Sequence, residues 1–428
     1  MKEELLYWLR GVWRRAKEAP VLMGVNVVGT ALALGTIMTA MMYQNSLTAD
    51  FYPSSKRNRY LYVSTVNLYE KKGPGAAHWN CSPSYLKGLA KANHVEAMAM
   101  MDDACRGLSF SVPGEARTVT LDARGVNGDF WRVFDWDFIQ GAGFSEAEVE
   151  AGVGTVVIGE RLAKEFFGDD NAVGREVEVN YYPMKVCGVV RDVSSYVEEA
   201  YAEVWYPYSA MKVEKSGNSP LQGPLAACFL VDSKSNMGEA RASIEELAQR
   251  QMESEEFLRL DLLGQPDGQY AYKYRTMSRA PEVTFRRAGY WTLVVLMLLI
   301  PTVNLATVSG ALLRRRRNEM GVRRVYGAQP QRLVWQMCSE SFVYTLAGGV
   351  LGLLLAIVAA YVVCDAFYVS VSYRATLGAV AADRLPVGAL LSVKIFFQGL
   401  LLCVAFNLLS TLLPAVRAAR RPVVESLK

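Results

Sequence analysis

The side chains that most often perform chemistry are sparse in this sequence, and none falls into a recognised catalytic or metal-binding pattern. The chain of 428 residues has only two histidines, His78 and His94, and nothing around them has the spacing of metal ligands. None of the seven cysteines lies in a C-x-x-C pair, which argues against a zinc or dithiol redox site. We therefore expect no metal, no cofactor and no catalytic residue in this chain.

Motifs for hydrolysis and for nucleotide binding are also absent. The sequence has no nucleophile elbow, no H-E-x-x-H and no G-x-x-x-x-G-K-[ST] phosphate loop, and Gly168 to Arg175 is not one. The alternating acids Glu146, Glu148 and Glu150 indicate a solvated turn. The chain is thus not an ATPase by itself, and any ATP hydrolysis is expected from a separate partner chain.

The elements that dominate the chain are membrane helices. Its 51% hydrophobic share and mean hydropathy of +0.11 suit a protein that is part membrane and part aqueous. Four segments have the length of about 20 mostly apolar residues that a membrane helix needs, namely 20–43, 288–313, 341–364 and 395–414. The first is long for a signal peptide, and three later spans need an anchored chain, so we interpret it as an uncleaved span.

Basic residues indicate the orientation of these spans. Lys and Arg gather in residues 1–19, in the loop 314–340 and in the tail 415–428, whereas the loop 365–394 has few. Because basic loops stay in the cytoplasm, both termini and the 314–340 loop are predicted to be cytoplasmic. Residues 44–287 and 365–394 are then outside. The net charge of +4 favours no partner class, and we expect no nucleic-acid partner.

Two membrane features predict contacts. The head, residues 1–19, places Leu5, Trp8 and Leu9 opposite Arg14 and Arg15 in a helical pattern typical of an amphipathic helix on anionic lipid. In the third span, small residues recur every fourth position and allow another helix to approach closely. This stripe consists of Gly348, Gly352, Ala356 and Ala360.

The outer segment 44–287 is predicted to be an α+β domain, and its size suggests two subdomains. The patterns predict strands at 60–68 and 153–158, a hairpin of 176–180 with 184–191, and helices at 84–92, 160–167 and 237–251. Its aromatic residues, among them Trp205 and Tyr206, favour core and strand surface over a ligand box. In an oxidising compartment Cys81 and Cys105 can pair, but so can other combinations with Cys187 or Cys228.

One long segment of the outer domain resembles the periplasmic core domain of MacB-type ABC transporter permeases. The run GDFWRVFDWDF contains the aromatic pair Phe130-Trp131, and VVIGE at Val156 to Glu160 matches the strand-helix junction of that domain. The pairs Gly143-Phe144 and Phe167-Gly168 and the segments Val173 to Arg175 and Gly188 to Asp192 match further positions. The sequence departs from the pattern at Ala142-Gly143, where Gly-Arg is usual.

A second segment resembles the FtsX-type permease signature, which is a basic run, E-[IM]-G-[VI]-R-[KR]-x-x-G-A and a glycine-rich membrane helix. It extends from Arg314 to Ala356, and the tail PAVRAARRPVVESLK resembles the family's ending. Within it, Glu319, Gly321, Arg323, Arg324 and Gly327 form the expected ATPase-coupling loop. Positive-inside anchoring would explain the arginines but neither the glutamate nor the two spaced glycines.

The resemblance implies a permease subunit in the bacterial inner membrane that relays the motion of a separate ABC ATPase subunit to the periplasmic domain. That domain would handle a peptide, a lipoprotein or a drug-like substrate. The implied partners are the ATPase, a second permease in a homodimer or heterodimer, inner-membrane lipids, and a periplasmic adaptor with an outer-membrane channel.

Two other functions remain open at this stage. One is a membrane receptor or regulator that signals across the inner membrane, although the chain has no attached signalling domain. The other is an FtsX-like role in cell division, which the large outer domain disfavours. An adjacent ATPase gene would favour the permease.

Overall fold

The computed structural model places the chain in two compact units. It describes residues 17, 20–70, 76–102, 106–168, 170–194, 197–211, 221–253, 258–275, 280–315, 326, 329–369, 396–402, 404, 405, 408 and 412. Unit 1 holds three long helices and the described residues from 396 onward, and unit 2 runs from Leu47 to Val283. The boundary falls where the long helices meet the connections to the sheet.

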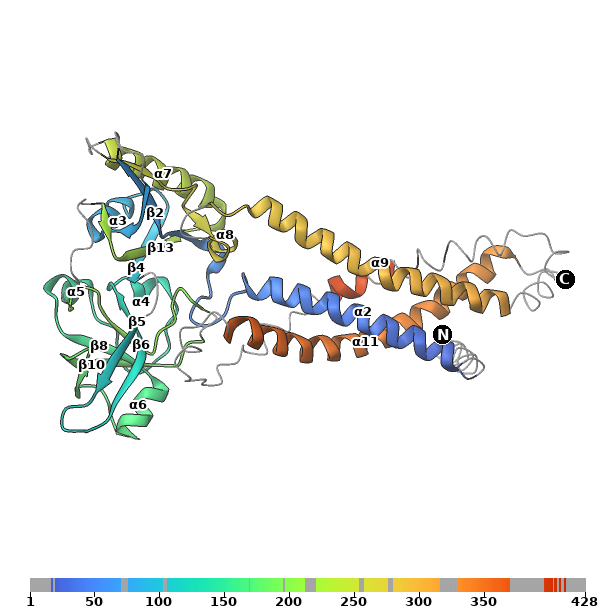
Figure 1. Ribbon diagram of the computed structural model, residues 1–428, viewed down its shortest axis with the longest axis horizontal. Coiled ribbons are helices and arrows are strands. Elements are labelled where there is room, and N and C mark those ends of the chain that lie inside the picture. The colour runs from blue at the N-terminus through green and yellow to red at the C-terminus, as the bar shows by residue number, and fades with distance from the viewer. Residues whose placement is uncertain are drawn as a thin grey trace. The chain divides into compact units, whose positions relative to one another are not determined.

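The helices of unit 1 are α2 (Pro20–Ser46), α9 (Val283–Arg315) and α11 (Pro330–Val369) (Figure 1). With a rise of about 1.5 Å per residue, each is longer than the hydrocarbon core of a bilayer, which is about 30 Å thick. By length and composition alone, Met23–Ser46 and Phe342–Ala359 can cross a membrane. The span expected at 288–313 lies within α9, whereas the one expected at 395–414 is described only in part, so four spans remain a prediction.

Unit 2 is built on one sheet, to which every strand described in it belongs. The main path of neighbouring strands is β11-β8-β10-β9-β5-β6-β4-β13-β3-β2-β14, and β1, β7, β12 and β15 pair beside it. The strands are β1 (Tyr60–Val63), β2 (Val66–Glu70), β3 (Ala76–Cys81), β4 (Val95–Asp102), β5 (Arg106–Ser111), β6 (Thr118–Val126), β7 (Phe138–Gly141), β8 (Thr155–Gly159), β9 (Glu176–Val179), β10 (Tyr182–Val190), β11 (Val204–Pro207), β12 (Gln222–Gly223), β13 (Leu225–Val231), β14 (Leu258–Asp261) and β15 (Asp267–Gly268).

The strand pairings confirm the predicted α+β class. The pairs β8–β10 and β6–β11 are parallel, whereas neighbours such as β4–β13 and β5–β6 are antiparallel. Short helices accompany the strands at both ends of the sheet (Figure 1). They are η1 (Arg57–Arg59), α3 (Pro83–Leu89), α4 (Phe130–Val133), α5 (Glu146–Ala151), α6 (Glu160–Phe167), η2 (Lys234–Asn236), α7 (Met237–Glu253) and α8 (Gln269–Lys273).

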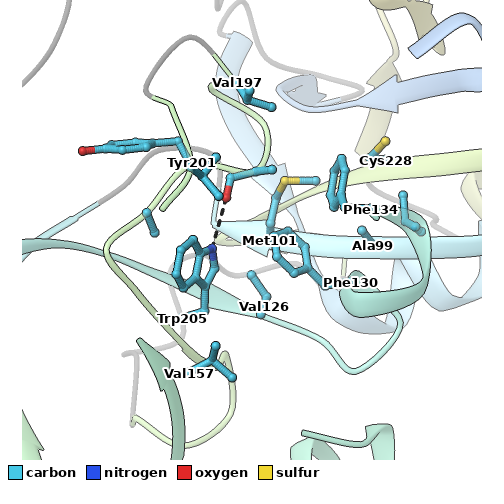
Figure 2. Packing of buried hydrophobic residues seen from close by; sticks show 14 of the residues in the cluster. Ala99, Met101, Val126, Phe130, Phe134, Val157, Val197, Tyr201, Trp205 and Cys228 are labelled. Carbon is cyan, nitrogen blue, oxygen red and sulfur yellow. Dashed lines mark hydrogen bonds between the residues drawn. The ribbon is translucent and has the colours of Figure 1, made fainter. Parts of the chain in front are cut away.

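The two subdomains expected within the outer domain stay a prediction. The contacts leave unit 2 as a single compact body. One buried cluster includes Tyr62 of β1 together with Ala99 of β4, Val157 of β8 and Trp205 of β11. Figure 2 shows the last three of these residues. These strands are linked through their neighbours, because β11 pairs with both β8 and β6, β6 pairs with β4, and β13 pairs with both β4 and β1.

Local sequence explains several elements at one end of the sheet. Ser82 caps α3 by accepting a hydrogen bond from the Tyr85 backbone N–H at 3.1 Å, and Pro83 begins the helix. Leu86 of α3 and Ile244 of α7 are buried against Phe229 of β13. All seven residues of β13 are buried, which suits a continuous apolar run inside a layered domain.

The structure confirms the helix at 160–167 as α6 and the helix at 237–251 as α7, and it divides the strand predicted at 60–68. Between β1 and β2, the Gln265 side chain accepts from the Ser64 backbone N–H at 2.6 Å and donates to the Thr65 carbonyl at 2.7 Å. At Ser64 and Thr65, the Gln265 side chain thus makes the hydrogen bonds that the backbone of a neighbouring strand would otherwise make. The chain can therefore leave β13 as a neighbour and pair with β3.

The predicted hairpin forms between β9 and β10, and its turn has an unusual residue. Val179 pairs with Tyr182, which leaves Asn180 and Tyr181 as the two turn residues, with φ of 51° and 65°. Two positive φ values are typical of a type I′ turn, which favours glycine at the second position. Tyr181 stands there instead and is 82% exposed.

Candidate functional site

The expected coupling loop lies outside the described residues. Glu319, Gly321, Arg323, Arg324 and Gly327 fall in segments that the structure does not describe. Their role in contact with an ATPase therefore stays a prediction.

The small-residue stripe of α11 lies against α2. A Cβ atom added to Gly348 would stand 2.8 Å from Cβ of Thr30, and one added to Gly352 would stand 2.9 Å from the Ala31 carbonyl oxygen. Ala356 is fully buried in the same interface, and the Ala360 side chain is not among those described. At these positions the two backbones approach to a distance that leaves no room for a larger side chain.

A hydroxyl group also joins the two helices. The Thr39 Oγ1 of α2 donates to the Gly35 carbonyl at 2.8 Å and lies 3.4 Å from the Ala356 carbonyl of α11. Gly35 approaches from the α2 side, since a Cβ there would stand 3.3 Å from the Gly352 carbonyl oxygen. The interface therefore combines small residues on both helices with one polar contact.

The aromatic residues of the GDFWRVFDWDF run form a packed cluster beneath the sheet. Trp131 lies edge-on to Phe144 with ring centroids 5.3 Å apart, and Trp136 lies edge-on to Trp205 at 5.1 Å. A Cβ added to Gly143 would stand 2.5 Å from the Trp131 indole. These motif residues thus specify packing, and this agrees with the interpretation of the aromatic residues as core rather than as a ligand box.

A cleft of about 260 Å³ opens beside β4. Strand β4 pairs with β6 only at Met101 and Val126. Beyond that pair, the Asn127 side chain accepts from the Met100 backbone N–H at 2.8 Å and donates to the Met98 carbonyl at 3.0 Å. Asn127 therefore stands in for a neighbouring strand, and the space beyond it becomes the cleft.

The lining of the cleft is partly apolar and partly charged. The apolar lining comes from Val95, Ala97, Met98 and Met100 of β4, and the charged lining residues are Lys87, Glu96, Asp129 and Glu146. Such a surface can take up an apolar group beside a polar one, but it has no nucleophile or base aimed at a reacting atom.

Lys87 of α3 spans the cleft to reach α5. Its Nζ lies 2.7 Å from Glu150 and 3.3 Å from Glu146. The hydrogen bond with Glu150 raises the pKa of Lys87, and the same bond lowers the pKa of Glu150. Burial raises the pKa of Tyr208, which stands near the same charges. Lys87 and Glu150 therefore both stay charged at neutral pH, so their contact is an ion pair and not a proton relay.

The acidic segment at 146–150 was wrongly predicted as a solvated turn. It forms α5, in which Ser145 and Glu148 form a reciprocal capping box and Glu146 accepts from the Gly128 backbone N–H at 2.9 Å. The sequence contains the signal for this helix, because Ser145 followed three residues later by Glu148 is a helix-start pattern. Its pairing with Lys87 depends on the fold and has no local signal.

Thiol and metal chemistry find no support in the described part of the chain. No group of three His, Cys, Asp or Glu side chains among those residues could hold a metal ion. The structure gives no disulfide among Cys81, Cys187 and Cys228, and Cys105 lies outside the described residues, so its pairing stays a prediction. Burial raises the pKa of Cys187 to about 12 and that of Cys228 well above its ordinary value, so neither forms a reactive thiolate at neutral pH.

Two family models match the chain. The model of the MacB-like periplasmic core domain matches residues 23–247, and the model of the FtsX-like permease C-terminal domain matches residues 291–423. The first model alone matches more than half of the chain, and the second covers most of α9, all of α11 and the chain up to residue 423.

Similar curated proteins are exporters. The pyoverdine export ATP-binding/permease protein PvdT of Pseudomonas aeruginosa is 23% identical over 371 residues, which are 83% of this chain and 51% of the relative. The macrolide export ATP-binding/permease protein MacB of Salmonella typhi is 22% identical over 361 residues, which are 83% of this chain and 52% of the relative. The chain thus spans about half the length of these curated relatives.

Two solved structures show a weaker likeness. The periplasmic region of MacB from Actinobacillus actinomycetemcomitans is 20% identical, with a TM-score of 0.33 and coverage of 46% of this chain and 88% of that one. The extracellular domain of the noncanonic ABC-type transporter YknZ from Gram-positive bacteria is 15% identical, with a TM-score of 0.33 and coverage of 46% and 99%. Scores at this level support no conclusion about function.

Proposed function

The chain belongs to the MacB/FtsX-like family of ABC transporter permeases, and from this premise we propose that it is the transmembrane subunit of a transporter driven by a separate ATPase chain. The observation that carries the proposal is the order of the two matched domains in a chain without a phosphate loop. The curated relatives are named as ATP-binding/permease proteins, and this chain spans about half of their length.

In the proposed arrangement the chain crosses the inner membrane of a bacterium four times, with both termini in the cytoplasm. The basic segments 1–19, 314–340 and 415–428 support this orientation. Cysteines introduced at the exposed positions Ala116 and Gln329 test it, because an impermeant reagent added outside should label only the first. If the reagent labels only Gln329→Cys, the chain has the opposite orientation in the membrane.

The ATPase would act through the 314–340 loop. Two copies of the permease, identical or different, would bind two ATPase subunits, and closure of the ATPases would move the loop and the helices that continue from it. Unit 2 would receive this motion outside the membrane and act on the cargo. The printed names of the relatives support an exported cargo, and a peptide, a lipoprotein or a drug-like molecule is the proposed class.

Purification of the full chain in detergent, followed by identification of the chains bound to it, tests the proposal. We expect an ABC-type ATPase in equal number and no ATP hydrolysis by the permease alone. Gly321→Leu or Gly327→Leu should lower assembly or separate hydrolysis from function, because a side chain blocks a close backbone approach. Gly289→Leu is the matched control, since nothing lies within 4 Å of a Cβ there. Hydrolysis by the isolated chain, or the absence of an ATPase, would contradict the proposal.

A further inference from the structure

Three charged side chains meet in the interior of unit 2. The Arg57 Nη2 lies 2.9 Å from Glu199 Oε1, and the Lys273 Nζ lies 3.6 Å from Glu199 Oε2. The side chains of Arg57 and Glu199 are 0% exposed, and that of Lys273 is 4% exposed. Charges are rarely buried so completely unless each is held by a partner. Glu199 contacts both cations, and Lys273 has a second carboxylate partner in Glu198, whose Oε2 lies 3.2 Å away.

Arg57 belongs to the connection between α2 and the first strand of the sheet. Its Nη1 donates to the Ala49 carbonyl at 3.0 Å, and its backbone N–H donates to Asp50 Oδ1 at 2.9 Å. The guanidinium also stands 4.1 Å from the ring centroid of Phe51. Arg57 therefore contacts Ala49, Asp50 and Phe51 in the segment that follows α2 and joins that segment to Glu199.

Lys273 belongs to the connection that leads to α9. It ends α8, and the same short helix contributes Gln269, whose Nε2 donates to Glu199 Oε1 at 3.4 Å. Gln269 in turn accepts from the Tyr62 hydroxyl at 2.6 Å, and Tyr62 stacks on Tyr272 with centroids 4.1 Å apart. The second connection is thus held by the same carboxylate and packed against β1.

Glu199 itself is anchored in the core. It lies in the segment between β10 and β11, where its carbonyl accepts from Arg124 Nη1 of β6 at 3.1 Å. The next carbonyl, of Ala200, accepts from the Trp205 indole of β11 at 3.1 Å (Figure 2). The carboxylate is therefore a fixed point of the sheet and not a mobile side chain of a loop.

The charge state of Glu199 suits this position. Burial by itself would raise its pKa, but the positive charges of Arg57 and Lys273 more than offset burial and hold the pKa at about 2. The group is thus ionised at every physiological pH. Removing this charge would leave two buried cations without their shared partner.

We propose that Glu199 is a positioning residue that ties the connections to α2 and α9 to one point of the sheet, so that displacement of either helix reaches β6 and β11. This inference rests on the proposed function, in which the membrane helices drive unit 2. Without such a tie, motion of a helix would be absorbed by the connection next to it, since short irregular segments yield before packed sheets do.

Hydrogen exchange of the full chain in lipid nanodiscs tests the tie without any ATPase. Glu199→Gln keeps the shape of the side chain and removes the charge, and we expect exchange to rise about ten-fold in both connections, 49–57 and 269–275. Glu198→Gln is the matched control, because Glu198 lies 3.2 Å from Lys273, is 49% exposed and, among the described contacts, makes none with Arg57. It should leave 49–57 unchanged. Unchanged exchange at 49–57 in Glu199→Gln would overturn the proposal.

Two further measurements keep the test decisive. Exchange in peptides of β13 reports whether the domain as a whole stays folded. If these peptides also exchange faster in Glu199→Gln, the variant Arg57→Lys is tested in place of Glu199→Gln. Lysine keeps the positive charge but cannot contact Ala49 and Glu199 together. Arg57→Lys should loosen 49–57, and the proposal fails if it does not. With the co-purified ATPase and ATP, the parent should show an exchange change in unit 2 that Glu199→Gln lacks. If the parent itself shows none, the proposed function fails, while the ATP-free pattern still decides on Glu199.

Discussion

Replacing Gly352 by alanine tests the packing of α11 on α2. The new Cβ would stand 2.9 Å from both the Ala31 carbonyl oxygen and Leu34 Cβ, and 3.2 Å from the Gly35 backbone nitrogen. Two of these three atoms belong to the backbone of α2, so the strain cannot be relieved by rotation of a side chain. The helices must move apart instead.

Two opposing terms determine the expected change in the free energy of unfolding. Alanine in a helix is favoured over glycine by about 0.5–1 kcal/mol because it has less freedom to lose. Overpacking a close contact costs about 1–3 kcal/mol, because a gap of even 0.5–1 Å forfeits part of the dispersion energy along the interface. The cost of the close contact exceeds the gain from helix propensity, so we expect Gly352→Ala to lower the free energy of unfolding by about 1–2 kcal/mol.

Gly289→Ala in α9 is the matched control, since nothing lies within 4 Å of its Cβ position. That variant should gain about 0.5–1 kcal/mol from helix propensity alone. Unfolding of the full chain in mixed micelles by a denaturing detergent measures both free energies. If the two variants shift stability in the same direction and by the same amount, the close contact at Gly352 does not exist and the reasoning is refuted.

Two other predictions concern unit 2. Tyr181→Gly should raise the free energy of unfolding by about 1 kcal/mol, because tyrosine is strained at the positive φ of the β9–β10 turn. Asn180→Ala should lower the free energy of unfolding, because alanine is also strained at a positive φ. Thermal melts that rank the two variants in another order would contradict the turn assignment. His94 hydrogen-bonds Asp232 at 3.0 Å and Glu239 at 3.1 Å, and the bond to Asp232 raises the pKa of His94 and lowers that of Asp232. The contribution of His94 to the stability of the folded domain is therefore fully present below about pH 6.5 and is lost as pH rises through the folded pKa of His94. Between about pH 6 and pH 8, the melting temperature of the parent should therefore fall more steeply with pH than that of His94→Gln.

The sequence alone determined the elements whose signals are local. Helix α6 coincides with the predicted 160–167, and α3 (Pro83–Leu89) begins one residue before the helix predicted at 84–92. The long apolar segments and the two family motifs were also readable, because span length and motif spacing require no knowledge of distant residues. The coupling-loop motif could be recognised in the same way, although its contacts remain to be tested.

Only the tertiary structure decided which distant residues meet. The spacing of Gly348 and Gly352 predicts a close helix neighbour, but only the tertiary structure identifies that neighbour as α2. The aromatic residues of the motif pack in the core around Trp131. Gln265 divides a strand and Glu199 pairs with Arg57 and Lys273 from opposite ends of unit 2. No local pattern can encode these pairings, because burial and charge compensation depend on which segments the sheet brings together.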